Sequence, residues 1–235
     1  MEEGTPETSH TPVALLAARN EADSIEQTIV ALGEAIPGVV IWVADDASGD
    51  GTGPIAATQG ATVVTRRNPL GKGGNVTECA IEMLAGEGAG DPDQVVLLLD
   101  GDLGPSAAAL SRLVEAVAER DCDLAVAAFA RRVGGGFGFA LGFARWAIRN
   151  RSGFVAEAPI SGQRAMRREV LEAVLPFADG WGMEVGMTID AVRAGFTVRE
   201  YELDLSHRAT GRTLGGFLHR FRQLGGFVRA WWGRR

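Results

Sequence analysis

The chain of 235 residues contains a single lysine, Lys72, among its 23 basic residues. Lysine offers a compact ammonium where arginine offers a planar guanidinium, and the two are not interchangeable at a site that needs a point charge. The scarcity of lysine therefore marks Lys72 as a candidate for contact with a phosphate group. Chance is the alternative explanation for one residue.

The sequence also has few cysteines and no long apolar run. Cys79 and Cys122 are the only two cysteines, and both are expected to be buried free thiols in a reducing cytoplasm. No uninterrupted apolar stretch reaches the ~18 residues of a membrane-spanning helix. The polar, acidic start Met1-Glu2-Glu3-Gly4 does not read as a signal peptide. We therefore expect a cytoplasmic chain, and its 46% hydrophobic content is enough for a full core.

Two segments of this acidic chain lack acidic residues altogether. The net charge is −7, yet residues 131–151 hold five arginines and residues 206–235 hold seven, without any aspartate or glutamate. Such asymmetry indicates a surface that meets an anionic partner. Arginine faces that are merely solvated are the alternative.

Hydrophobic periodicity predicts strands that alternate with helices along the first half of the chain. Strands are predicted at residues 13–18, 39–44, 61–65, 95–100 and 123–130. Helices are predicted at residues 24–35, in a short segment after Thr52, at 75–84 and at 106–120, the first one opened by a capping box at Ser24-Ile-Glu-Gln27. This order indicates an α/β fold with a mostly parallel, Rossmann-like central sheet and flanking helices.

The second half is less regular. A loop rich in glycine and phenylalanine leads into an amphipathic helix that ends near residue 150. Strands are then predicted at residues 159–166 and 196–205, and helices at 168–174, 183–194 and 214–232.

The buried strand at residues 95–100 ends in Asp100-Gly101-Asp102. Side chains two apart in an extended segment share a face, so both carboxylates are expected to converge. The carboxyl ends of parallel strands are where open α/β sheets bind ligands. Paired carboxylates there suit Mg²⁺ or Mn²⁺ held together with substrate phosphates. The alternative is an acidic turn without a ligand.

Other polar residues collect at neighbouring strand ends. Because parallel strands finish at one edge of a sheet, we expect these side chains to line the same edge as Asp100. They are Glu21, Asp45, Asp46 and Lys72.

With these pieces placed, the chain resembles the family-2-like glycosyltransferases of the GT-A fold. Four segments carry the resemblance, in the order in which that family has them: Leu16-Ala-Ala-Arg-Asn-Glu21, Asp45-Asp-Ala-Ser-Gly-Asp-Gly-Thr52, Gly71-Lys-Gly-Gly74 and Asp100-Gly-Asp102. The first departs from the family in having Ala17 where a proline is usual. The resemblance implies a nucleotide-sugar donor and a divalent metal, Mg²⁺ or Mn²⁺.

The resemblance also implies roles for individual residues. Residues implied to bind the nucleotide sugar are Ala17, Arg19, Glu21, Asp45, Gly71, Lys72 and Asp100. Asp102 and His207 would bind the metal, and Asp102 and Glu184 would be the catalytic residues. The acceptor would contact Gly162, Gln163 and Arg164.

Two branches of the family are similar to the second half of the chain. Pro159-Ile-Ser-Gly162, the stretch from Pro176 to Gly186 and His207-Arg208 are similar to glucosyl-3-phosphoglycerate synthases, and the overall spacing is similar to short polyprenyl-phosphate sugar transferases. The synthases read a small anionic acceptor with a Gly-Gly-Arg-Val-Thr type of loop, but residues 134–139 are Gly-Gly-Gly-Phe-Gly-Phe here. We therefore expect transfer, with UDP-glucose the favoured donor, to a polyprenyl or lipid phosphate. A synthase-like retaining transfer to a small soluble acceptor is the alternative.

Three other classes of protein fit the residues less well. A dehydrogenase needs Gly-x-Gly-x-x-Gly after the first strand and a nucleotidyltransferase a glycine-rich turn there, whereas this chain has Ala17-Ala-Arg-Asn20. A nucleotide-sugar-binding protein without catalysis is the third, and the intact Asp100-Gly-Asp102 and His207 argue against it. Nothing indicates a nucleic-acid partner.

The arginine-rich end of the chain bears on the partner. Phe217, Phe221, Leu224 and Val228 recur at helical spacing between arginines, which is typical of a helix in the headgroup layer of a membrane. Packing on the body or in a homodimer is the alternative. We therefore expect a disordered tail at residues 1–12, one GT-A domain at 13–213 and a basic amphipathic helix at 214–235. Residues 13–104 would form the donor half, residues 105–213 the acceptor half, and the enzyme would be peripheral on the inner face of the cell membrane.

Overall fold

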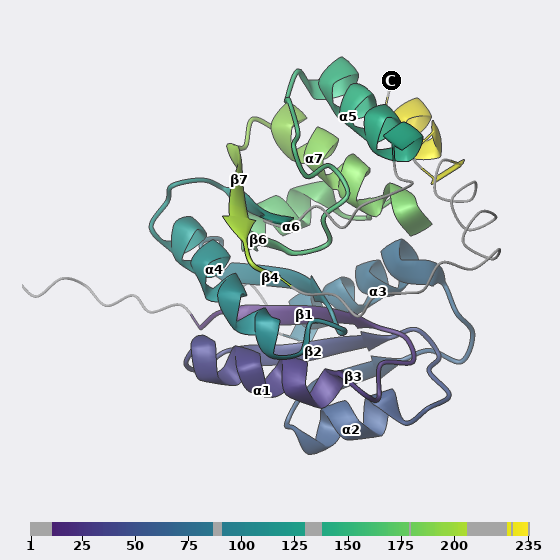
Figure 1. Cartoon of the computed structure of the whole chain (residues 1–235), viewed down its shortest axis with the longest axis vertical. Helices are drawn as coiled ribbons and strands as arrows, with labels where there is room; N and C mark the ends of the chain where they lie inside the picture. The colour runs from purple at the N-terminus through teal and green to yellow at the C-terminus, as the bar shows by residue number, and fades with distance from the viewer. Residues whose placement is uncertain are drawn as a thin grey trace, which may run out of the picture.

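The computed structural model describes residues 11–86, 91–129, 138–178, 180–205, 225–226 and 228–234. Seven strands of this part of the chain form one sheet in the order β3-β2-β1-β4-β6-β5-β7 (Figure 1). Their bounds are β1 (Val13–Ala18), β2 (Val40–Asp45), β3 (Thr62–Thr65), β4 (Val95–Asp100), β5 (Leu124–Phe129), β6 (Arg164–Arg167) and β7 (Val198–Leu203). Strand β6 runs antiparallel to β4 and β5, and the other pairs are parallel. The predicted α/β architecture with a mostly parallel sheet is confirmed.

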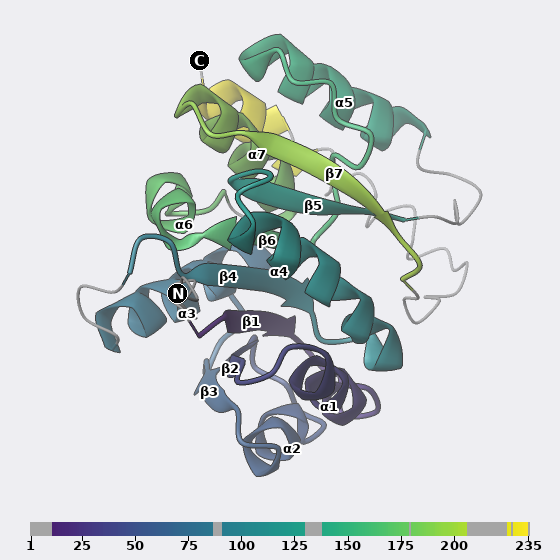
Figure 2. The same ribbon diagram turned by 90° about the vertical axis from the view of Figure 1, so that its left-hand side faces the viewer.

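Helices cover both faces of the sheet (Figure 2). One layer holds α1 (Ile25–Ala35), α2 (Thr52–Thr58), the 3-10 helix η1 (Gly104–Leu110) and α4 (Ser111–Ala118), and the other holds α3 (Gly71–Gly86), α6 (Arg168–Val174) and α7 (Met183–Arg193). Alternation along β4 explains the two layers: Leu97 and Leu99 pack into the first core, Val96 and Leu98 into the second. Asp100 follows on the α3 side by the same alternation.

Several predicted boundaries are wrong, each for a local reason. Helix α3 begins at Gly71 rather than Asn75, because the Asp46 carboxylate accepts hydrogen bonds from the backbone N–H groups of Leu70 and Gly71. The strand expected at 159–166 begins only at Arg164, as β6. Glu200 of β7 accepts the N–H groups of residues 157 and 158, and the Ser161 N–H then donates to the Ala158 carbonyl in a turn. The helix expected at 106–120 begins as η1.

The capping box expected at Ser24 is also wrong. The Ser24 side chain makes no cap hydrogen bond at the start of α1. It donates instead to the backbone oxygen of Gly101, and Thr28 Oγ1 donates to the same oxygen. This part of α1 thus ties down the turn that follows β4, next to Asp100.

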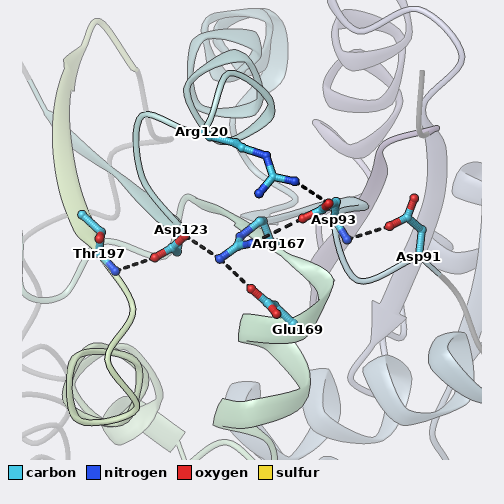
Figure 3. Close-up of polar contacts among 7 residues, drawn as sticks. All are labelled: Asp91, Asp93, Arg120, Asp123, Arg167, Glu169 and Thr197. Carbon is cyan, nitrogen blue, oxygen red and sulfur yellow. Dashed lines mark hydrogen bonds and ion pairs between the residues drawn. The ribbon is translucent and has the colours of Figure 1, made fainter. Parts of the chain in front are cut away.

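Ion pairs join the strands at the amino edge of the sheet (Figure 3). Arg167, at the end of β6, lies 2.6 Å from Asp123 and 2.5 Å from Glu169, and 3.3 Å from Asp93. Asp93 also pairs with Arg120, and Asp123 accepts the Thr197 N–H at 2.7 Å. The partners precede β4, β5 and β7, so this cluster fixes the starts of three strands around one guanidinium.

The last described residues lie against the second half of the fold. Helix α5 (Gly138–Ser152) packs on α7, and the helical residues 225–226 and 228–233, yellow in Figure 1, lie beside both. We call residues 225–226 and 228–234 the C-terminal segment. Among the helices of the described ranges, none is long and apolar enough to cross a membrane.

Candidate functional site

The register of the sheet places the expected residues along one edge. Ala17 of β1 lies opposite Asp100 of β4, and Ala18 lies opposite Asp45 of β2. Strand β4 ends at Asp100, and Gly101 and Asp102 form a turn. The rule for side chains two apart in a strand therefore does not place Asp100 and Asp102 on one face, and that sequence argument fails even though both residues belong to the same edge.

Lys72 lies at the centre of the edge. From the first turn of α3, its Nζ is 2.6 Å from Asp100 Oδ1 and 2.9 Å from Glu184 Oε1 in the first turn of α7. Burial alone would lower the pKa of Lys72, but the charges of Asp100 and Glu184 and the hydrogen bonds to both hold that pKa above its ordinary value of 10.5. The only lysine of the chain is therefore a fixed cation that joins a strand end to a helix start.

A loop closes over this ion pair from the β6 side. Gln163 Nε2 donates to Asp100 Oδ2 at 2.8 Å, and Ser161 Oγ donates to Gln163 Oε1 at 3.2 Å. A Cβ on Gly162 would lie 2.5 Å from Lys72 Nζ and 2.8 Å from Asp100 Oδ2. Only a glycine lets this loop approach the charged atoms so closely.

Packing between α3 and the chain before α7 brings Glu184 to Lys72. The backbone of Gly73 lies so near the Ala178 carbonyl that a Cβ there would overlap it. Thr77 of α3 accepts the Phe177 N–H at 3.0 Å and donates to the Gly73 carbonyl at 2.7 Å. The glycines around Lys72 thus allow α3 to approach the chain before α7 closely, in addition to allowing the turn that opens α3.

The loops after β1 and β2 are tied together beside this cluster. The N–H groups of Asn20 and Glu21 donate to Ser48 Oγ and Thr52 Oγ1, and the N–H of Gly49 donates to Asn20 Oδ1. Asn20 and Ala47 have positive φ angles of 57° and 60°, a strained conformation for residues other than glycine, which is often found at functional sites.

Asp45 and Asp46 have different environments. The Asp45 side chain is buried and accepts the Ser48 N–H at 3.0 Å. Asp46 caps the start of α3 and lies 3.8 Å from the exposed Arg19. Sequence reasoning placed Asp46 at the edge but gave it no role in the site. Its signal was its position directly after Asp45, before a loop that leads to the only lysine.

Arg164 is buried deeper than an acceptor contact requires. Its side chain is 1% exposed, its Nε donates to the Ser161 carbonyl at 2.9 Å, and its Nη1 donates to Thr188 Oγ1 at 2.8 Å. Its Nη2 is buried and has no hydrogen-bond partner in the described part of the chain. Burial lowers the pKa of Arg164 to about 10, against the opposing charges of Glu184 and Glu200.

The donor set at this edge fits a hard divalent cation. Asp102 offers carboxylate oxygens, the ligands that Mg²⁺ and Mn²⁺ take together with phosphate oxygens, whereas both oxygens of Asp100 already accept hydrogen bonds from Lys72 and Gln163. Within the described ranges, no three histidine, cysteine or acidic side chains are grouped to hold a metal by themselves. The predicted ligand His207 lies outside the described residues, so the metal assignment stays a prediction.

The structure therefore gathers some of the expected residues into one contact network and separates others. Lys72, Asp100, Gly162, Gln163 and Glu184 meet. Arg19, Glu21 and Asp45 lie in the adjoining loops, Gly71 starts α3, and Arg164 lies beneath the loop that carries Gly162. Sequence reasoning missed Ser161 and Thr188, which support Gln163 and Arg164 through contacts between segments that no spacing reveals.

A mostly parallel sheet with a charged cluster at its carboxyl edge is typical of α/β proteins that bind a ligand at their strand ends, and the comparisons with known proteins narrow this class to the GT-A type. The model of "Glycosyl transferase family 2" matches residues 14–175, and the chain belongs to this family.

Two curated relatives differ in the length that they share with this chain. The "Glucosyl-3-phosphoglycerate synthase" of Mycolicibacterium paratuberculosis is 31% identical over 200 residues, which cover 75% of this chain but 58% of the synthase. The chain thus spans less than two thirds of that relative. The "Undecaprenyl-phosphate mannosyltransferase" of Micrococcus luteus is 30% identical over 219 residues and 86% of both chains.

Solved structures of a synthase are similar across nearly the whole chain. One holds the Mycobacterium tuberculosis glucosyl-3-phosphoglycerate synthase with Mn²⁺, UDP and glucosyl-3-phosphoglycerate, at a TM-score of 0.73 and 26% identity over 96% of this chain and 81% of the synthase. Another holds the same synthase with Mg²⁺ and UDP, at a TM-score of 0.73 and 27% identity over 96% and 80%. The GT-A-like fold predicted from the sequence motifs is confirmed.

Proposed function

We propose that this protein is a metal-dependent glycosyltransferase that moves a hexose from a nucleotide-diphosphate sugar, with UDP-glucose favoured, to a polyprenyl or other lipid phosphate at a membrane surface. The observation that carries the proposal is the ion-paired cluster of Lys72, Asp100 and Glu184 at the carboxyl edge of the sheet. Family membership, and the UDP and Mn²⁺ or Mg²⁺ in the synthase structures, support the donor and the metal.

The donor would lie across the loops that follow β1, β2 and β4. Glu21 and Asp45 would hold the nucleoside, with Ala17, Arg19 and Gly71 lining the same position, and Asp100 would contact the sugar. A divalent cation on Asp102 and His207 would supply electrostatic stabilisation of the diphosphate as it leaves. Lys72 adds a fixed positive charge next to that position, and its raised pKa keeps it charged at neutral pH.

The transfer step needs no base when the acceptor is a phosphate. A phosphate oxygen would attack C1 of the sugar, the bond from C1 to the diphosphate would break, and its electron pair would leave with the nucleoside diphosphate. An ionised phosphate has no proton to lose, whereas a hydroxyl acceptor needs a general base. Glu184 already accepts a hydrogen bond from Lys72 at 2.9 Å, so we assign it to positioning the sugar and Lys72 rather than to removing a proton.

The acceptor would approach past Gly162 and Gln163. Gln163 donates a hydrogen bond to the second oxygen of Asp100. Because Asp100 would contact the donor sugar, a group bound to Gln163 would lie beside that sugar. Arg164, expected from the sequence to contact the acceptor, is buried beneath this loop, where its Nε holds the Ser161 carbonyl, so we assign it to supporting the loop that carries Gly162 and Gln163. Coverage of 86% of the Micrococcus luteus lipid-phosphate enzyme, against 58% of the synthase, favours the lipid phosphate.

A second candidate is a synthase-like transfer to a small soluble acceptor such as 3-phosphoglycerate. The likeness to the synthase structures over 96% of this chain favours it. Both candidates use the same donor edge, so only the acceptor distinguishes them.

The test is a comparison of acceptors at fixed donor and metal. UDP-glucose and GDP-mannose are each incubated with the full chain, Mn²⁺ and either a short-chain polyprenyl phosphate or 3-phosphoglycerate, and released nucleoside diphosphate and the glycosylated product are measured. We expect a glycosyl lipid phosphate and metal-dependent release. Product from 3-phosphoglycerate alone would replace the first candidate with the second, and no product with either would contradict the assignment of both acceptors.

A further inference from the structure

The C-terminal segment is fastened to the helix that carries Glu184. Arg234 Nε lies 2.7 Å from both carboxylate oxygens of Asp190, on α7. The backbone at Gly182 and Gly186 makes room for the segment, since a Cβ at Gly182 would lie 2.8 Å from the Gly226 carbonyl and one at Gly186 would lie 2.7 Å from the Arg234 guanidinium. The segment is therefore packed against α7 and does not stand as a separate helix.

The same segment is fastened to α5 on its other side. Trp231 Nε1 donates to Asn150 Oδ1 at 3.1 Å, and the Arg151 guanidinium lies 4.4 Å from the centre of the Trp231 ring. Arg151 Nε also donates to the Trp231 carbonyl at 3.2 Å. These contacts build one surface from α5 and the end of the chain, 81 residues apart at the Trp231–Asn150 contact.

Four aromatic rings form a row along this surface. The ring centres of Phe143 and Trp146 are 5.5 Å apart, those of Trp146 and Trp231 5.2 Å, and those of Trp231 and Trp232 5.9 Å. Trp146 is 47% exposed and Trp232 is 56% exposed. We call these four residues, together with Arg145, Arg149 and Arg229, the tryptophan platform.

The charged residues that α5 and the C-terminal segment contribute are all arginines. The side chains of Arg145, Arg149 and Arg229 are exposed, and neither Arg149 nor Arg229 forms an ion pair with an acidic residue that the structure describes. Helix α5 contains no acidic residue, and neither does the chain from residue 206 to its end. The three arginines therefore present positive charge to the solvent, where it can attract an anionic surface.

We propose that the tryptophan platform is the surface by which this protein binds an anionic lipid bilayer. Tryptophan rings favour the boundary between headgroups and acyl chains because one part of the ring is apolar and the N–H is polar. Arginines near an anionic leaflet are attracted to its phosphates, and the effect falls off within a Debye length. The row of rings suits the boundary between headgroups and acyl chains, and the arginines suit the layer of lipid phosphates.

Packing on the body is the alternative given for the amphipathic helix expected at residues 214–235. This helix falls largely outside the described residues, and its described end packs on α5 and α7 instead of standing alone. Because α7 also carries Glu184, the platform holds the catalytic edge in a fixed relation to the bilayer. The inference rests on the proposed function, because a lipid-phosphate acceptor is the reason to bind a bilayer. Its test measures vesicle binding and does not require sugar transfer.

The test is co-sedimentation of the full chain with vesicles of phosphatidylcholine alone or with one third phosphatidylglycerol. We expect binding to the anionic vesicles, weakened by salt. The double variant Trp146→Ser with Trp232→Ser should bind at least about tenfold more weakly, because each exposed ring carries a large apolar area. Ile81→Ser removes a residue of similar exposure, 53%, from α3 and is the matched control, expected to bind as the wild type.

A second pair of variants tests the charge. Arg149→Gln with Arg229→Gln should lose about fivefold in binding per arginine at low salt and approach the wild type at high salt, while Arg112→Gln on α4 should change nothing. These exposed substitutions also keep the test open if the tryptophan variant fails to fold, which far-ultraviolet circular dichroism reports.

Two results would overturn the inference. One is a folded tryptophan variant that binds anionic vesicles as well as the wild type. The other is a wild-type chain that ignores vesicles but dimerises in light scattering through the same tryptophans, which would make the platform an interface between copies. Vesicle binding without transfer to polyprenyl phosphate would leave this inference standing and contradict the proposed acceptor alone.

Discussion

The two edges of the sheet each hold a cation among carboxylates, and they differ in what surrounds it. At the amino edge, Arg167 is 16% exposed and is held by Asp93, Asp123 and Glu169, which lie in or beside the segments it joins. At the carboxyl edge, Lys72 is held by Asp100 and Glu184, with glycine backbone on the third side. A hollow of about 460 Å³ opens at the amino edge. Of the four described charged residues that line it, Arg120 and Arg167 both pair with Asp93, and Glu115 lies near Arg112.

The difference teaches how to separate a structural ion cluster from a functional one. Arg167 joins the starts of β4 and β5 to the first turn of α6, so its three ion pairs serve the fold. Lys72 is paired in the same way, but it lies among the loops of the carboxyl edge, where Asn20 and Ala47 adopt strained backbone and open sheets bind ligands. We therefore expect changes at Lys72 and its neighbours to affect turnover, and changes at Arg167 to affect stability.

The largest effect is expected for Asp102→Asn. The substitution keeps the size of the side chain and removes the charge that would hold the metal, so transfer should fall by about 100-fold or more. Far-ultraviolet circular dichroism should show an unchanged fold, because Asp102 is partly exposed in a turn. Transfer that resists both this substitution and EDTA would show that the metal assignment is wrong.

Gly162→Ala should lower transfer by about tenfold. Its Cβ would lie 2.5 Å from Lys72 Nζ, so the loop or the ion pair must shift, and small displacements at a catalytic site are costly. Gly33→Ala on α1, where nothing lies within 4 Å of the added Cβ, is the matched control and should leave kcat unchanged. Equal kcat for both variants would mean that the loop is not part of the site.

Arg167→Gln should destabilise the fold by about 2 kcal/mol while leaving the transfer rate of folded protein unchanged. Removing the guanidinium leaves Asp123 and Glu169 without this counter-charge, while Asp93 keeps its ion pair with Arg120. Denaturant unfolding measures the change in the free energy of unfolding. The control is Arg112→Gln, whose partner Glu115 is exposed and lies 3.7 Å away; its loss should cost less than about 0.5 kcal/mol. If Arg167→Gln lowered kcat at unchanged stability, the two edges would not differ as we describe.

The smallest effect is expected for alkaline pH. The pKa of Lys72 is raised above 10.5, so its contribution to stability is complete below that pH and is lost only as pH rises through the raised value. Affinity for UDP with Mg²⁺ should therefore change by less than about twofold between pH 7 and 9. A tenfold loss in that range, absent in Lys72→Met, would mean that the ammonium titrates and that the ion pair is weaker than the geometry indicates.

Sequence patterns predicted the strands at the donor edge well because their information is local. The five apolar residues before Asp100 form β4, and β1 matches its predicted bounds. Alternation and strand ends were sufficient to place Lys72, Asp100 and Asp45 on one edge.

Contacts between distant segments explain what the sequence did not predict. The start of α3 depends on Asp46, 25 residues before Gly71, and the loop before β6 is held by Glu200, which lies more than 40 residues after it. The burial of Arg164 under Ser161 and Thr188 follows from the packing of α7. The docking of Arg234 on Asp190 likewise needs the folded chain, because arginine content alone fits a solvated helix equally well.

The most direct test of the central claim is calorimetric titration of UDP into the wild type, Lys72→Arg and Arg167→Gln, each with and without Mn²⁺. We predict Mn²⁺-dependent binding by the wild type and by Arg167→Gln with similar Kd, and at least about tenfold weaker binding by Lys72→Arg, because a guanidinium is a wider, planar group and not a point charge. Equal affinity of Lys72→Arg and the wild type, or metal-independent binding, would contradict the assignment of this edge as the nucleotide-sugar site.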